Sequence, residues 1–328
     1  MAGHTRGLHS LADIAGRNAA IRRAVTPLPG SRTLDRFKAL NIPGDCDGLN
    51  LLTALERMVP SVAAAEWQAE FAQGRIVSWE QRPVGGTQIV RAGHRYRHLF
   101  PNVIEPDVNG NVEILHEDEA LIVVDKPAPL PMHAGGRFYL NTLQHILNVA
   151  YHPQTPQPAH RLDANTTGLV LVARTRLRAA ELQAQFAQGR VEKTYLVRVS
   201  GQLPVDDFHC DAAISAGPGE RCSRTVDLES GKSARTEFRL LRRFVDGTSL
   251  LAARPLTGRT NQIRVHLWHL GVPVCGDALY LPGQQLGRTQ TLAVGEPPLC
   301  LHAAQVRFLH PQSREPMEFD APAPDWAK

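Results

Sequence analysis

The order of strand-like and helix-like segments after residue 110 is the feature that most constrains the fold of this chain. Strands are expected at Val112–His116 and Ala120–Asp125, and Asn141 can cap a helix that runs through Ala150. The apolar run Gly168–Arg174 predicts a buried strand, and Thr175 can cap a helix to Gln188.

The later segments continue this irregular order. They are strands at Lys193–Val199, Arg235–Arg242, Ser249–Arg254 and His302–Leu309, and a helix from a Thr260 cap to Leu270, closed by Gly271. Because strands and helices alternate without a regular strand–helix–strand repeat, the sequence predicts an α+β sheet domain.

The N-terminal third is organised differently. Residues 1–38 carry seven Lys or Arg and two acidic side chains, a net charge of +5, so residues 1–43 are interpreted as a basic, partly flexible leader. Apolar spacing predicts helices over Gly48–Pro60 and Val62–Gln73, followed by short strands and turns. The predicted divisions are therefore 1–43, a small module at 44–105 and a main domain at 106–328.

Composition limits the class of protein. Hydrophobic residues make up 43% of the 328 residues, which is enough for a sizeable core, and a net charge of +4 is compatible with a polyanionic partner. The five cysteines include no C-x-x-C pair, so neither a zinc site nor a disulfide framework is expected, and a reducing cytoplasm fits best. No apolar stretch approaches membrane-spanning length.

A carboxylate stands at the entrance of the most apolar strand. In HRLDANTTG, Asp163 precedes the run Leu169–Val172. The ordinary explanation is a turn in which Asp, Asn and Thr side chains bond to backbone N–H groups. Tyr195 in EKTYLVRV would ordinarily be a packing residue, and Arg259 and Arg264 in GRTNQIRVH would ordinarily be solvated or bound to phosphate.

In this order and spacing, HRLDANTTG, EKTY, TGRTNQIRVH, GDALY and LHA closely resemble the signature of the RluA family of pseudouridine synthases. The resemblance covers about Val112 to Leu309. It implies a pseudouridine synthase fold, with a central mixed or antiparallel sheet flanked by helices and a small N-terminal α/β module. This module would either bind RNA, as in many family members, or serve as a purely structural cap. The resemblance also implies isomerisation of a specific uridine in ribosomal or transfer RNA, with base flipping, no cofactor and no metal.

The resemblance assigns roles residue by residue. It makes Asp163 the catalytic nucleophile, Tyr195 the aromatic side chain that stacks on uracil, and Arg264 the partner of the catalytic carboxylate. Substrate-binding roles are implied for Arg161, which would enter the space left by the target base, for Leu301 as an apolar wall, and for Arg259, His302 and Thr167. The family usually has His where this chain has Asn261, and often Ser where it has Thr167.

The chemistry explains these residue types. The N1–C1′ bond breaks, the uracil turns, C5 attaches to C1′ and the C5 proton leaves, so no redox change occurs. Burial favours the neutral form of a carboxyl group, so an ionised Asp163 needs a fixed cation beside it, and an Arg fork suits that duty. A loop uridine is the cheapest to extrude. Backbone phosphates could bind to Arg174, Arg176, Arg178, Arg190, Lys193 and Arg254, which could equally be a solvated charged surface.

Two other functions remain open from the sequence. One is an RNA-binding protein of the same fold that has lost activity, although the complete set of Asp163, Tyr195 and Arg264 argues against that loss. The other is a metal-dependent hydrolase built on His160 and Asp163, although no pair of ligands stands at zinc spacing. The favoured interpretation is a monomeric, cytoplasmic enzyme that acts on RNA and does not enter membranes.

Overall fold

The computed structural model describes residues 11–60, 62–220 and 223–328, and the chain forms two compact units. The larger unit combines the chain up to Ser31 with Glu105–Lys328, and the smaller unit is Arg32–Ile104. The smaller unit is therefore an insertion near the start of the larger one. The sequence-based ranges differ from this division, because they ended a leader at residue 43 and counted none of it with the main domain.

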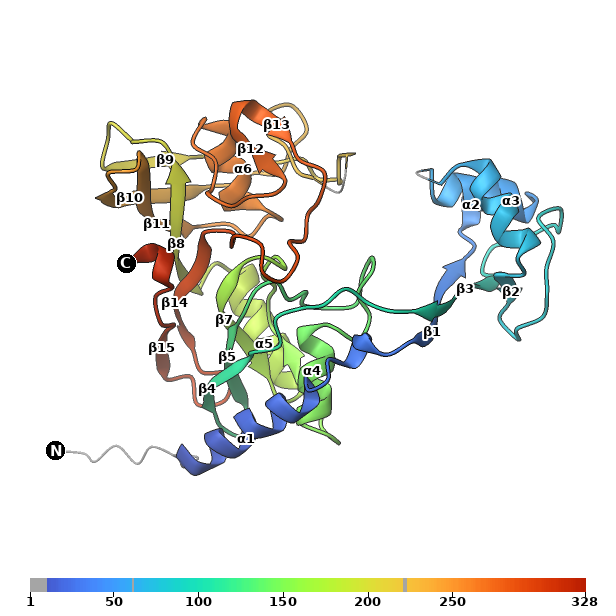
Figure 1. The fold of residues 1–328 in the computed structure, drawn as a ribbon, viewed down its shortest axis with the longest axis horizontal. Helices are drawn as coiled ribbons and strands as arrows, with labels where there is room; N and C mark the ends of the chain where they lie inside the picture. Colours follow the sequence, from blue (N-terminus) through green and yellow to red (C-terminus); the bar gives the residue numbers. More distant parts are fainter. Residues whose placement is uncertain (1–10, 61, 221–222) are drawn as a thin grey trace. The chain divides into compact units, whose positions relative to one another are not determined.

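The larger unit is built on one mixed sheet (Figure 1), which contains ten strands among the described residues. The strand order is β4-β5-β7-β14-β8-β11-β10-β9, with β15 beside β14 and β6 beside β7. Most neighbours are antiparallel, but β7 and β14 are parallel. The strands are β4 (Glu113–Glu117), β5 (Leu121–Lys126), β6 (Gln157–Pro158), β7 (Thr167–Ala173), β8 (Glu192–Ser200), β9 (Asp207–Cys210), β10 (Thr236–Arg243), β11 (Thr248–Pro255), β14 (Leu301–Leu309) and β15 (Pro316–Asp320). The predicted mixed sheet is confirmed.

Helices cover both faces of the sheet at β5 and β7. Alternate residues of these strands enter two different cores, with Val170 and Val172 packing in one and Leu169 and Leu171 in the other. The first core contains side chains of α1 (Leu11–Ala24) and α4 (Leu143–Ala150), and the second contains side chains of α5 (Arg176–Ala187). Burial on both faces explains why these strands are continuous apolar runs.

Helix α1 belongs to the larger unit, although its sequence suggested part of a flexible leader. Ile21 is fully buried in the core, and Arg17 donates to Glu117 and to the carbonyl oxygen of Ala150, the latter at 2.7 Å. The Arg17 guanidinium also lies 3.9 Å from the centre of the Tyr151 ring. The net charge of the segment did not reveal that one of its arginines is directed inward. Residues 1–10 of the leader lie outside the described residues.

Three helix caps show where local rules succeed and fail. Thr175 caps α5 as expected, by accepting from the backbone N–H of Arg178. The cap of α4 is Thr142, because the Asn141 side chain instead accepts from Gly30 N and donates to the carbonyl oxygen of Pro106. Helix α6 (Gln262–His269) begins after Asn261, which adopts a left-handed conformation with φ 58°, so Thr260 is not its cap.

The smaller unit is a three-stranded antiparallel sheet with two helices. The helices α2 (Leu51–Met58) and α3 (Ala64–Ala72) lie within the predicted ranges. The strand order is β1-β3-β2, with β1 at Leu34–Asn41, β2 at Ile76–Ser78 and β3 at Arg95–Val103. The sequence did not predict β1 or β3, because charged residues interrupt both strands and leave no clear apolar pattern. No described helix in either unit is both long and apolar enough to cross a bilayer.

One short strand pair completes the larger unit. Strands β12 and β13 form a small hairpin after α6, at Tyr280–Leu281 and Gln285–Leu286. This hairpin packs with α6, since Trp268 donates to the carbonyl oxygen of Leu281 and its ring lies 5.4 Å from that of Tyr280. The packing brings the segment that follows α6 back to the helix start, where the polar site described next is found.

Candidate active site

A cavity of about 500 Å³ opens in the larger unit, between the start of α6 and the loop before β7. It brings together six of the eight residues predicted for the site. They are Arg161, Asp163, Tyr195, Arg259, Arg264 and Leu301. These residues come from segments separated by up to 140 positions, so the fold gathers them into one place.

A buried lysine holds the loop that carries Asp163 through hydrogen bonds to backbone carbonyl groups. Lys126 is completely buried at the end of β5, and its Nζ donates to the carbonyl oxygens of Pro127, Leu130 and Ala164 at 2.9–3.2 Å. Burial lowers the pKa of Lys126 to about 7, against the opposing charges of Asp163 and Asp125. On the other side of the loop, Asn165 binds the backbone of Gln290 and Leu292.

Arg264 links Asp163 to a second, fully buried carboxylate. Arg264 Nη1 donates to Asp163 Oδ2 at 3.0 Å, while Nε and Nη2 grip Asp277 at 2.7 and 2.8 Å. Burial by itself would lower the pKa of Arg264, but hydrogen bonds to Asp277 and the charges of Asp277 and Asp163 raise it above its ordinary value. Asp277 also accepts from the backbone N–H groups of Leu279 and Tyr280, so the guanidinium is held in one orientation.

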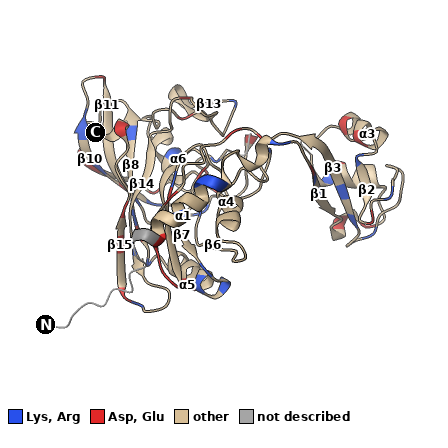
Figure 2. Ribbon diagram, turned by 60° about the horizontal axis from the view of Figure 1, so that its bottom comes forward, with Lys and Arg blue, Asp and Glu red and all other residues tan. Residues whose placement is uncertain are grey.

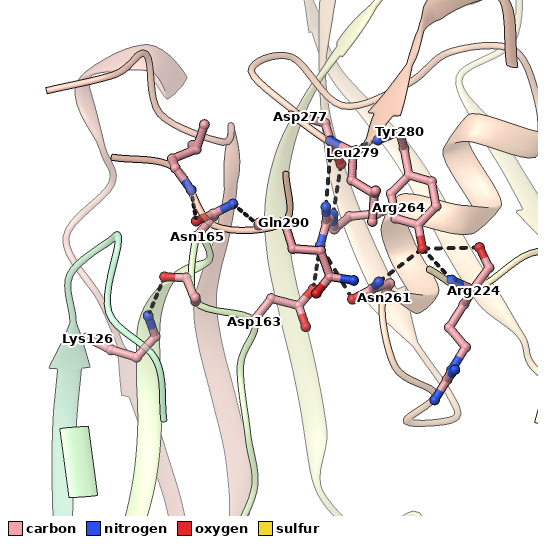
Figure 3. A network of polar contacts seen from close by, with 12 residues as sticks. Lys126, Asp163, Asn165, Arg224, Asn261, Arg264, Asp277, Leu279, Tyr280 and Gln290 are labelled. Carbon is pink, nitrogen blue, oxygen red and sulfur yellow. Dashed lines mark hydrogen bonds and ion pairs between the residues drawn. The ribbon is translucent and has the colours of Figure 1, made fainter. Parts of the chain in front are cut away.

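Asn261 is a second donor to Asp163. Its amide lies between Asp163 and Tyr280 (Figure 3), and an oxygen facing the carboxylate would be repelled, so Nδ2 faces Asp163. In that orientation Nδ2 is 2.9 Å from Oδ2 and 3.1 Å from Oδ1, and the amide oxygen accepts from the Tyr280 hydroxyl at 3.0 Å. The hydroxyl in turn accepts from the backbone N–H of Arg224 at 2.8 Å.

Tyr195 places its ring in the cavity wall on β8. Burial, with a smaller contribution from the charge of Asp163, raises the pKa of Tyr195 above its ordinary value. The phenol therefore stays protonated at neutral pH, and it can offer an aromatic face and a hydroxyl donor but not a ready base.

The cavity wall is strongly cationic. Among the described residues that line it, Asp163 is the single carboxylate, whereas Arg161, Lys193, Arg259 and Arg264 are cationic. Burial lowers the pKa of Lys193, and this ammonium has no acidic partner within ion-pair distance in the described chain. The wall thus combines one held anion with cations that suit a polyanionic ligand.

Thr167 and His302 do not line the cavity, although both were predicted for the site. Thr167 Oγ1 and His302 Nδ1 lie 2.8 Å apart and join β7 to β14. Next to them Gly168 has φ 105°, and a Cβ there would stand 2.3 Å from the carbonyl oxygen of Ala303. The close approach of the two strands needs glycine at this position. This approach fixes where the Asp163 loop ends and β7 begins.

The structure also reveals residues that sequence reasoning did not assign. Asp277 and Tyr280 stand in the GDALY motif, Asn261 was noted as a departure from the family pattern, and Lys126 follows Asp125 in a strand. Arg174, for which the sequence left open a phosphate contact or a solvated position, binds Glu117 and the carbonyl oxygen of Asp118. Pairing over long sequence separations carries no local signal, so these assignments needed the fold.

Within the described ranges, no group of three or more His, Cys, Asp or Glu side chains could hold a metal ion.

The sheet and its polar cavity define an RNA-modifying isomerase of the pseudouridine synthase class, as comparison with known proteins shows. Residues 120–269 match the RNA pseudouridylate synthase family. The chain belongs to the RluA family of RNA pseudouridine synthases.

Its relatives cover different shares of the chain. Ribosomal large subunit pseudouridine synthase D of Nitrosomonas europaea is 35% identical over 307 residues, which is 90% of this chain and 87% of that protein. Dual-specificity RNA pseudouridine synthase RluA of Yersinia pestis is 33% identical over 64% of this chain and 98% of its own. The solved structure of human RNA Pseudouridylate Synthase Domain Containing 1 has a TM-score of 0.53 and 26% identity, over 65% of this chain and 84% of that one.

Proposed function

We propose that this enzyme converts a loop uridine of large-subunit ribosomal RNA into pseudouridine, with Asp163 as the nucleophile. The observation that carries the proposal is the single carboxylate of a cationic cavity, held by Arg264 and Asn261. Two donors on one carboxylate fix its direction. A ribosomal substrate is favoured because the relative that spans 90% of the chain, including most of the smaller unit, is named for the large ribosomal subunit.

Each wall of the cavity then has a duty. The ring of Tyr195 stacks on the detached uracil while it turns, and Leu301 closes the apolar side. Arg161 fills the space that the flipped base leaves, and Lys193 and Arg259 hold phosphates beside it. Thr167 and His302 support the site from behind by joining β7 to β14.

The reaction needs no group from outside the chain in this proposal. Asp163 acts on the ribose or the base as the N1–C1′ bond breaks, and C5 replaces N1 on the same C1′ carbon. The C5 proton then leaves to solvent and N1 takes up a proton from solvent, so atoms and charge balance without a cofactor. We further propose that the enzyme is cytoplasmic, where its ribosomal substrate is made, and that it acts as a monomer.

The first test replaces Asp163. The Asp163→Asn protein should form pseudouridine in a large-subunit ribosomal RNA transcript at least about 1000-fold more slowly than the wild type, because an amide cannot act as the nucleophile. Pseudouridine is measured by mass spectrometry of the digested RNA. A matched control, Asp207→Asn, removes an exposed carboxylate from β9 and should retain full activity.

Further arms of this test separate the competing functions. A wild-type protein that binds the transcript but never forms pseudouridine would favour an RNA-binding protein without activity. Activity that disappears with a chelator and returns with metal would favour the metal-dependent alternative. A pseudouridine map of ribosomal and transfer RNA with and without the gene names the target, and loss of signal only in transfer RNA would contradict the ribosomal assignment.

A further inference from the structure

The sheet of the smaller unit has two unlike faces. Tyr96 and His98 of β3 point to the helix side, where His98 contacts Trp67 of α3 with ring centres 5.3 Å apart. Arg95 and Arg97 alternate with them and therefore lie on the other face. On that face the neighbouring side chains are Phe37 of β1 and Trp79, which directly follows β2.

These four residues, Phe37, Trp79, Arg95 and Arg97, form a continuous surface that we call the aromatic face. The Arg95 guanidinium lies 3.5 Å from the centre of the Trp79 ring, and that of Arg97 lies 4.6 and 4.7 Å from Trp79 and Phe37. The two rings meet edge to face with centres 6.0 Å apart. Phe37 is 46% exposed, which is unusual for so large an apolar side chain.

The charge of the aromatic face is only partly offset. Arg97 interacts electrostatically with the exposed Glu80, and Arg95 Nε donates to Asn41 Oδ1 at 3.3 Å. In the described chain neither Arg95 nor Arg97 forms an ion pair, and the adjacent Glu80 accepts a hydrogen bond from Ser78 instead. Arg97 Nε is buried without a hydrogen-bond partner. The helix side differs, because the acidic groups of α3 are Glu66 and Glu70, and Glu70 binds His98 and Arg75. Figure 2 shows this contrast as blue on the strands and red on α3.

We propose that the aromatic face binds an unpaired segment of the RNA substrate. Phe37 is exposed and Trp79 is half-buried under the Arg95 guanidinium. Aromatic rings interleaved with arginines are the combination that stacks on single-stranded bases and holds the phosphates between them. This inference rests on the proposed function, because it takes the RNA substrate as given, and it assigns the contact to the sheet rather than to the helices. A protein partner would need acidic groups to match the arginines. Such a partner would have no bases to stack on the two rings.

The test uses the full-length protein and two fluorescein-labelled probes, a 12-nucleotide single-stranded RNA of mixed sequence and a 12-base-pair RNA duplex. Phe37→Ala and Trp79→Ala should each raise the Kd for the single strand about tenfold, because each removes a stacking surface. Their effect on the duplex should be less than about twofold, since paired bases offer no free faces. Fluorescence anisotropy gives both values.

The arginines can be tested separately through the salt dependence of RNA binding. Arg95→Gln/Arg97→Gln should reduce the slope of log K against log salt for the single strand by about 1.4, because each phosphate contact contributes about 0.7. This variant keeps both rings, so it tests the face even if the aromatic variants fail to fold. The matched control is Arg57→Gln/Arg91→Gln, which removes two charges from the same unit outside the aromatic face and should leave the slope almost unchanged.

Clear outcomes would overturn the inference. Unchanged Kd and salt slope in all face variants would show that RNA binds elsewhere, while pseudouridine formation by the Asp163 site would be unaffected. A change from dimer to monomer in sedimentation on Trp79→Ala would identify a self-association surface instead. Conversely, an Asp163→Asn protein that remains active would end the proposed function and leave the binding result intact.

Discussion

The orientation of the Asp163 carboxylate is set by the side chains that donate to it, rather than by its position in a turn. Arg264 reaches it from 101 positions away, and Arg264 is itself aligned by Asp277, a carboxylate with no exposed surface. Asn261 adds a neutral donor whose oxygen is fixed by Tyr280. The nucleophile is thus held by one charged and one neutral group, and neither changes its protonation near neutral pH.

The neutral donor leads to a prediction for Asn261→Asp. The new carboxylate would face Asp163 at about 3 Å, so the two like charges would repel and the donated hydrogen bond would be lost. We expect kcat at pH 7 to fall about 100-fold, which corresponds to about 2.7 kcal/mol. Steady-state kinetics of pseudouridine formation measure this change.

The control is Asn261→His, which introduces the residue that the resemblance to the family implies at this position. His can also donate an N–H, and both Asp and His tolerate the left-handed backbone of this position, so strain is matched between the variants. Asn261→His should retain activity within about tenfold of the wild type. Equal activity of the Asp variant and the wild type at pH 7 would show that Asn261 does not donate to Asp163.

At the scale of elements, the parallel contact between β7 and β14 supports the site. The contact pairs His302 with Thr167 in register and follows the Asp163 loop directly. His302 is 2% exposed, and burial lowers its pKa to about 4, so it is neutral in the folded protein at pH 7. The strand pair therefore contains a buried group that acid must charge.

The free energy of unfolding should fall as the pH drops from about 6.5 to 4. In this pH window His302 is protonated in the unfolded chain but not in the folded chain. The free energy of unfolding therefore rises with pH and falls on acidification. The contribution of His302 is about 3.5 kcal/mol when its titration is complete, since its pKa falls by about 2.5 and each pKa unit is worth about 1.4 kcal/mol.

Urea titrations at pH 7, 6, 5 and 4 measure this dependence. His302→Gln cannot take up the proton, so it should lose about 3 kcal/mol less than the wild type between pH 7 and pH 4. His209→Gln changes an exposed His of β9 and should follow the wild-type curve. The same acid dependence in His302→Gln and wild type would show that His302 is not the group that resists protonation.

At the scale of the whole molecule, the smaller unit is an insertion and not an N-terminal extension. The backbone N–H of Glu105 donates to the carbonyl oxygen of Gly30 at 3.0 Å, so the chain leaves and re-enters the larger unit at neighbouring points. Helix α1 precedes the insertion but packs in the core of the larger unit. Deleting only the smaller unit therefore keeps α1 in the core of the larger unit, whereas truncating the chain from its N-terminus removes α1.

Two deletions test this organisation. Removing residues 32–104 and joining Ser31 to Glu105 through three glycines should leave the unfolding temperature of the larger unit nearly unchanged. Starting the chain at Glu105 also removes Ile21 and Arg17, which should cost about 2–4 kcal/mol through lost apolar burial and a weakened Glu117 pair. Thermal and urea unfolding compare the two proteins, and equal stability would mean that α1 contributes nothing to the larger unit.

Features that depend on residues close together in the sequence could be predicted, whereas features that depend on residues far apart could not. Periodicity and caps are local, so the buried strand β7, the Thr175 cap of α5 and the two helices of the smaller unit could be predicted. The strands β1 and β3 could not, because charged residues interrupt the apolar positions that Leu40 and Tyr96 contribute to the core of the smaller unit. Asn141 and Thr260 failed as caps because tertiary partners used Asn141 and the αL turn at Asn261 displaced the helix start.

By itself, the sequence determined the family, the irregular order of strands and helices, and the cluster of motifs around Asp163. Only the tertiary structure decided that Asp277 aligns Arg264, that Asn261 is a second donor, that Lys126 anchors the loop, and that Thr167 and His302 stand outside the cavity wall. The physical reason is distance along the chain. Buried charges and amides take their state from partners that lie many residues away, and those partners are known only once the chain has folded.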